Sequence, residues 1–131
     1  MSTAIASAST SSLRRTTSVV AAVGAAATTL GAATMRAAGV HLAADGRIPL
    51  AAFAQFTFAG AVLGGLLVAV LNRRSTLPRR RFIQTAVALT ALSCLAPAAA
   101  GDDVSSKIEL IAIHLLAATI IAPVLASQTT R

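Results

Sequence analysis

Residues 72–81 read NRRSTLPRRR and separate two long apolar runs, at 50–71 and 82–100, that contain no charged residue. A short basic segment between two such runs is typical of a cytoplasmic loop that joins two membrane-crossing helices. We therefore expect this loop to fix the orientation of the whole chain and to lie at the lipid headgroups. Its basic residues are Arg73, Arg74, Arg79, Arg80 and Arg81.

The composition is that of a membrane protein. The chain has 131 residues, of which 56% are hydrophobic and only 11% are charged, whereas ordinary soluble domains carry about 25% charged residues. The net charge of +7 raises the question of nucleic acid binding. However, the basic groups occupy short gaps between apolar runs, and the chain has four Phe but no Trp or Tyr for base stacking. We expect the partner of this charge to be anionic lipid headgroups and not nucleic acid.

Four apolar runs, at residues 17–35, 50–71, 82–100 and 108–126, predict four membrane-spanning helices. The shortest are 19 residues long, which at 1.5 Å per residue matches a hydrocarbon core of about 30 Å. The connections are short, so neighbouring helices should be antiparallel. The expected fold is an all-α, four-transmembrane-helix antiparallel bundle. Residues 1–16, rich in Ser, Thr and Ala, are expected to form a disordered N-terminal tail, and residues 127–131 a short C-terminal tail.

The first run, 17–35, has two interpretations. Ala and Thr dominate it, and it follows the pair Arg14 and Arg15. This pattern fits a retained helix, but it also fits a cleaved signal peptide. We favour the retained helix, because the run is longer than the apolar core of a usual signal peptide.

The distribution of basic residues predicts the orientation. Four crossings place both termini and the 72–81 loop on one side, with eight basic residues and no acidic residue. The other side holds three basic residues, Arg36, Arg47 and Lys107, and all four acidic residues of the chain. The positive-inside rule therefore predicts that the N-terminus and the C-terminus are both cytoplasmic.

Small residues suggest where helices pack closely. Gly60 and Gly64 form a small-xxx-small motif in the second run, and this motif lets backbones approach one another. In the first run, small residues also recur at helical spacing, at Gly24, Ala27, Thr28, Gly31 and Ala32. These faces suit packing within the chain, against further copies of it, or against another membrane protein.

His114 is the one ionisable residue well inside a predicted span, and such residues are costly in a bilayer. Antiparallel pairing of the last two spans puts it at the depth of Ser93. A hydrogen bond from His114 to Ser93, Cys94 or Thr90 would satisfy the ring and serve as interhelical glue, which is the interpretation we favour. The sharper alternative is a proton-titrating or ligand-binding site.

Enzymatic signatures are absent from the sequence. Two His and a single Cys, at positions 41, 94 and 114, do not have the spacing of metal ligands. There is no glycine-rich phosphate loop after a strand and no nucleophile elbow around Ser93. We expect a protein that is not an enzyme and that needs no metal or other cofactor. The leading hypothesis is a structural or accessory membrane subunit, and the alternative is a small oligomeric transporter or proton-linked carrier that uses His114 and the Thr90/Ser93 face.

Residues 50–126 resemble an uncharacterised family of small actinobacterial four-helix integral membrane proteins, catalogued as a domain of unknown function. The resemblance rests on LSCLAP at 92–97, on IHLL at 113–116 after Lys107, and on IAPVL at 121–125. This chain has Ala96 where the family usually has Gly and Ile113 where it usually has Met. The resemblance implies a four-helix fold in the bacterial plasma membrane, and it implies no activity.

Overall fold

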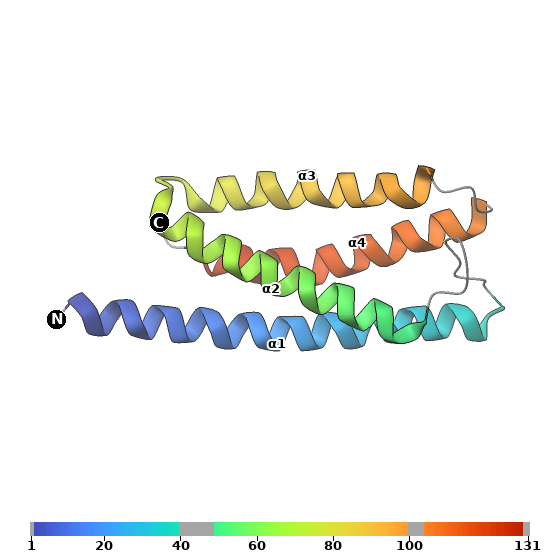
Figure 1. Ribbon diagram of the computed structural model, residues 1–131, viewed down its shortest axis with the longest axis horizontal. Coiled ribbons are helices and arrows are strands. Elements are labelled where there is room, and N and C mark those ends of the chain that lie inside the picture. Colours follow the sequence, from blue (N-terminus) through green and yellow to red (C-terminus); the bar gives the residue numbers. More distant parts are fainter. Residues whose placement is uncertain (1, 40–48, 100–103, 130–131) are drawn as a thin grey trace.

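The computed structural model describes residues 2–39, 49–99 and 104–129. These residues form the four helices α1 (Ser2–Ala37), α2 (Leu50–Arg74), α3 (Pro78–Ala99) and α4 (Val104–Ser127). The prediction of an all-α fold is therefore confirmed. Each helix runs in the opposite direction to the one before it (Figure 1), so the 75–77 turn and the two termini lie at one end of the bundle.

The helices form a bundle with α2 and α4 in its middle (Figure 1). α1 packs against both α2 and α4, and α3 packs mainly on α4 and less on α2. Among the described residues α1 and α3 are not in contact. The two outer helices therefore lie on opposite sides of the α2–α4 pair.

Three of the four helices lie close to the predicted runs, with ends that extend into the flanking polar residues. α2 continues from its predicted end to Arg74, because nothing in the basic loop breaks a helix before Ser75. Ser75 then turns the chain, with its Oγ accepting the N–H of Leu77 at 3.2 Å. α3 starts at Pro78, whose fixed φ and missing N–H suit the first position of a helix. Residue 100, the last of the predicted third run, lies outside the described residues.

The start of α1 differs from the prediction. The helix begins at Ser2, so residues 2–16 are helical, whereas the sequence indicated a disordered tail there. The stretch contains alanines, the best helix formers, and no proline or glycine. Within α1, Ser18 and Thr34 satisfy their hydroxyls on the carbonyls of Arg14 and Leu30, four residues earlier. Ser and Thr are therefore compatible with a long helix here.

Two clusters of buried side chains hold the helices together. The first lies toward the arginine-rich end and joins one residue from each helix: Val20, Val68, Phe82 and Leu125, with Ala126 beside them. The second lies toward the other end and joins α1, α2 and α4 through Ala32, Phe53, Leu110 and Ile113. Because α3 contributes a buried residue only to the first cluster, it is attached to the core chiefly at its N-terminal end.

Large apolar side chains cover much of the outside, among them Leu30 (69% exposed), Leu63 (65%) and Ile108 (62%). Three described segments are long and apolar enough to cross a membrane: Ser11–Ala37, Leu50–Arg74 and Val104–Ser127. An apolar exterior of this kind suits lipid and not water. The fold therefore fits a membrane protein. α3 is not among these three segments.

Candidate functional site: His114 and the helix interfaces

His114 does not bond to the third helix. It is half-buried on α4, and its Nδ1 lies 2.7 Å from the carbonyl oxygen of Leu110, one turn earlier. Because a carbonyl oxygen only accepts, Nδ1 carries the proton in this contact. The ring is thus held by its own helix, a local bond that is available to a side chain four residues after a carbonyl.

The predicted partners of His114 behave in the same way. Ser93 Oγ donates to the carbonyl of Thr90 at 2.8 Å, within α3. Thr90, Ser93 and Cys94 are all half-buried, and Cys94 is a free thiol. Among the described residues none of the three is hydrogen-bonded to His114, so the predicted interhelical bond does not form. His114 and Ser93 each bond within their own helix instead.

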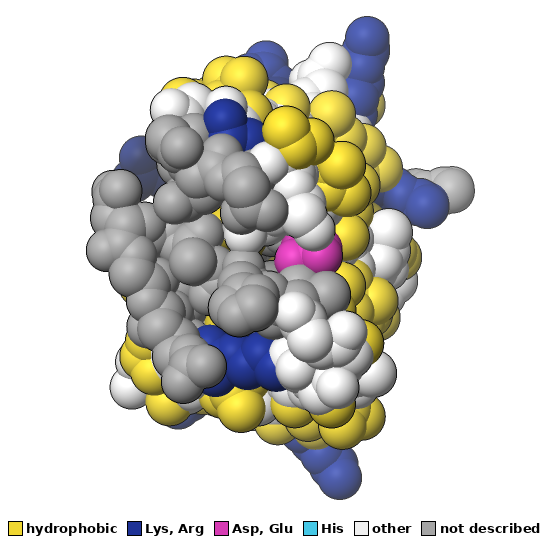
Figure 2. All heavy atoms as spheres, turned by 90° about the vertical axis from the view of Figure 1, so that its right-hand side faces the viewer, with side chains coloured by type: hydrophobic (Ala, Val, Ile, Leu, Met, Phe, Trp, Pro, Cys, Tyr) yellow, Lys and Arg dark blue, Asp and Glu magenta, His cyan; other side chains and the backbone are white. Residues whose placement is uncertain are grey.

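The contact that does join α3 and α4 through polar atoms lies at their loop end. Lys107 Nζ donates to the carbonyl of Ala98 at 3.2 Å. The last carbonyls of a helix have no partner within it, so a lysine there satisfies an acceptor and complements the helix dipole. Nearby on α4, Glu109 Oε1 accepts the hydroxyl of Ser105 at 3.0 Å. Figure 2 looks onto this end of the bundle and shows an acidic side chain there, with hydrophobic side chains along much of the rim.

The arginines gather at the opposite end. All five predicted for the lipid headgroups, Arg73, Arg74, Arg79, Arg80 and Arg81, are exposed. Arg14 and Arg15 of α1 are exposed as well. None of the three acidic groups of the 40–48 and 100–103 connections can be placed, because those connections lie outside the described residues.

The interface between α1 and α2 is built from small residues, but from a different face of α2 than the sequence motif indicated. Gly60 is exposed, and a methyl group on it would meet nothing within 4 Å. Gly64 does pack, against Leu125 of α4. The face turned to α1 consists of Thr57, Ala61 and Gly65, and the last two residues each follow a glycine of the motif by one position. A methyl group on Gly65 would come within 2.5 Å of Thr17.

A buried polar contact lies in the middle of this interface. Thr28 is fully buried on α1, and its Oγ1 lies 3.0 Å from Thr57 Oγ1 of α2. Thr28 Oγ1 is also 2.9 Å from the carbonyl oxygen of Gly24. Of the five small residues that recur at helical spacing in α1, three are buried (Gly24, Thr28 and Ala32) and two are half-buried (Ala27 and Gly31). The sequence therefore identified this face of α1 and missed its partner on α2.

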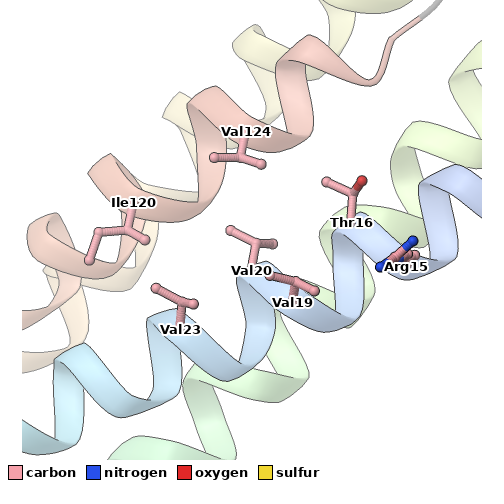
Figure 3. A pocket seen from close by; sticks show the side chains of 7 residues that line it. All are labelled: Arg15, Thr16, Val19, Val20, Val23, Ile120 and Val124. Carbon is pink, nitrogen blue, oxygen red and sulfur yellow. The ribbon is translucent and has the colours of Figure 1, made fainter.

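An open groove of about 370 Å³ runs between α1 and α4 (Figure 3). Its apolar walls consist of Val19, Val20 and Val23 on one side and Ile120 and Val124 on the other. Arg15 and Thr16 line one end of it. His114, Ser93 and Thr90 do not line this groove. Of the residues that do, the sequence had drawn attention to Arg15, as one of the basic residues at the start of the first run, but it had not indicated a binding site there.

Comparison with known proteins places the chain in a family. Residues 8–131 match the profile of a family of unknown function, DUF6069, and the chain belongs to that family. This agrees with the expected membership of an uncharacterised family. No curated protein and no solved structure matches the chain.

Proposed function

We propose that this member of the DUF6069 family is a non-enzymatic, multi-pass protein of the bacterial plasma membrane that serves as a structural or accessory subunit. The observation that carries the proposal is how the polar groups of the site predicted from the sequence are used. His114 and Ser93 each bond to their own helix, and the helices meet through small and apolar residues. Within the described residues, this use of the polar groups supports packing as the role of the interior.

We include α3 as the fourth membrane span. Its 22 residues correspond to a length of about 33 Å, close to the thickness of the hydrocarbon core. Its outer side carries Val87, Leu89, Leu92 and Leu95, all more than half exposed. It lies alongside α4, a span by length and composition. A helix with this exterior, packed along such a span, is best accommodated in the same bilayer.

We further propose that both termini face the cytoplasm. Seven exposed arginines lie at the end of the bundle that holds the termini and the 75–77 turn. Of the described residues at the other end, only Arg36 and Lys107 are basic, and Glu109 is acidic. The positive-inside rule favours the arginine-rich end as the inner one.

Single cysteines would test span number and orientation together. In a Cys94→Ser background, Thr76→Cys and Ser105→Cys place one thiol on each side of α3, and Gly39→Cys adds a third position at the α1 end. We expect a membrane-impermeant maleimide to label Gly39→Cys and Ser105→Cys in intact cells, and Thr76→Cys only after permeabilisation. Labelling of Thr76→Cys and Ser105→Cys from the same side would show that α3 does not cross.

Transport through His114 is the alternative that a flux experiment would decide. We expect proteoliposomes of the purified chain to pass no protons under a pH gradient above the rate of empty liposomes, and His114→Gln to behave identically. We also expect gentle detergent extraction to recover the chain with a membrane-protein partner or with further copies of itself. A proton flux that His114→Gln abolishes, with the variant still folded, would overturn the structural proposal.

A further inference from the structure

The groove between α1 and α4 is apolar along its length and charged at one end. Val20 and Val23 point from α1 toward Val124 and Ile120 of α4 (Figure 3). Val20 is also part of the first core cluster, so it forms the floor of the groove, whereas Val19 and Val23 are more than half exposed at its edge. From Arg15 to Val23 the groove covers about 12 Å of helix.

The charged end lies at the level expected of lipid headgroups. Gly24 of α1 lies beside Ile121 of α4, since a methyl group on Gly24 would be 3.1 Å from the Ile121 side chain. The two helices are antiparallel, and α4 ends six residues after Ile121, at Ser127. Arg15 is nine residues before Gly24, so it lies about 13 Å along α1 from the Ile121 contact, toward the arginine-rich end of the bundle. The guanidinium and the Thr16 hydroxyl therefore stand at the mouth of the groove, and its apolar part extends into the bilayer.

We propose that this groove binds one anionic phospholipid of the cytoplasmic leaflet, with an acyl chain along the valines and its phosphate at Arg15. Charge complementarity selects this occupant, because Arg15 and Thr16 supply donors where a phosphate presents acceptors. Arg15 is the one described arginine that lines the groove. The inference rests on the membrane placement and orientation proposed above, and it adds a defined site to the general attraction of the basic end for anionic lipid.

The test compares matched variants of the full chain in a mild non-ionic detergent, with retained lipid counted by native mass spectrometry. Phosphatidylglycerol is the probe and phosphatidylcholine the neutral control. We expect one tightly held phosphatidylglycerol in the wild type. Arg15→Gln should weaken it about fivefold, the effect of one basic residue near a lipid surface. Arg79→Gln removes an exposed arginine away from the groove and should change the binding less than twofold.

A second pair of variants tests the apolar part independently of charge. Val23→Phe fills the groove, whereas Val87→Phe enlarges an exposed valine of α3 that is outside it. We expect the first to lower lipid retention and the second to leave it unchanged.

Equal effects of Arg15→Gln and Arg79→Gln, or equal retention of the two lipids, would overturn the site. The site would also be overturned if the chain formed a dimer and Val23→Phe dissociated that dimer without changing the amount of bound lipid. These outcomes leave the cysteine-labelling result untouched, so failure of the site is distinguishable from failure of the membrane placement.

Discussion

At the scale of single residues, the glycines of α2 have opposite environments within one helix. A methyl group on Gly65 would stand 2.5 Å from both Oγ1 and Cγ2 of Thr17 and 3.0 Å from its Cβ. Thr17 is β-branched and has little freedom to move away within a helix. Gly65→Ala should therefore destabilise the protein by about 1–3 kcal/mol, as overpacking does. The measurement is the free energy of unfolding in detergent micelles.

Gly60→Ala is the matched control in the same helix. Nothing lies within 4 Å of the added methyl, and alanine is the better helix former, so stability should stay the same or rise slightly. If Gly60→Ala were the more damaging of the two, the α1–α2 packing described above would be wrong. Unfolding of both variants in the same detergent decides between these outcomes.

The sequence could not identify the packing face of α2, for a physical reason. Positions 60, 61, 64 and 65 are Gly, Ala, Gly and Gly, so each of two adjacent faces carries a small-xxx-small pair. The apolar residues of this helix surround it on all sides, and no polar stripe marks the side that faces lipid. The choice depends on the shape of α1, where Thr17 and Thr28 fit against Gly65 and Thr57.

At the scale of the helices, the threonine pair links α1 to α2 through a polar contact in the interface. A double-mutant cycle with Thr28→Val and Thr57→Val keeps the shapes similar and removes the hydroxyls. We expect a coupling of about 0.6 kcal/mol, the average for interhelical hydrogen bonds in membranes. Thr28→Val also removes the bond to the Gly24 carbonyl, but the cycle cancels that loss because it is the same whether or not Thr57 is replaced. Unfolding free energies of the two single variants and the double variant give this coupling; additive effects would show that the 3.0 Å contact contributes nothing.

The attachment of α3 depends on its first turns. Phe82 is 3% exposed and packs in the cluster that contains Val68 and Leu125, whereas Leu92, further along α3, is 65% exposed. Phe82→Ala should cost about 3 kcal/mol, the lower end for emptying a core position occupied by Phe. Leu92→Ala, which faces outward, should change stability by less than about 0.5 kcal/mol. Limited proteolysis in detergent is the measurement, and we expect faster cleavage around residues 75–77 in Phe82→Ala alone.

The helices themselves were largely predictable, and their mutual contacts were not. An apolar run of more than 18 residues is too long for an ordinary strand and too apolar for a helix in water. Hydropathy alone therefore predicts α2 and α4 as membrane-spanning helices. The start of α1 was missed because Ser and Thr favour turns in water, where their hydroxyls compete for the backbone. In α1, Thr29 and Thr34 bond to carbonyls one turn earlier. The partner of His114 was missed for the same reason, since a bond within one helix competes with a bond between helices.

At the scale of the whole molecule, the orientation depends on the number of basic residues at each end. Replacing the five arginines of the 72–81 loop with glutamine leaves three basic residues on each side of the predicted topology. The bias that orients the chain then disappears, and we expect a mixed population in which Thr76→Cys, in a Cys94→Ser background, becomes accessible from outside in a substantial fraction of molecules. The control variant Arg36→Gln/Lys107→Gln removes the two basic residues of the described outer end. It should preserve one orientation, because the excess of basic residues on the inner side over the outer side becomes larger. Unchanged protection of Thr76→Cys in the five-arginine variant would show that packing of the helices, and not the loop, sets the orientation.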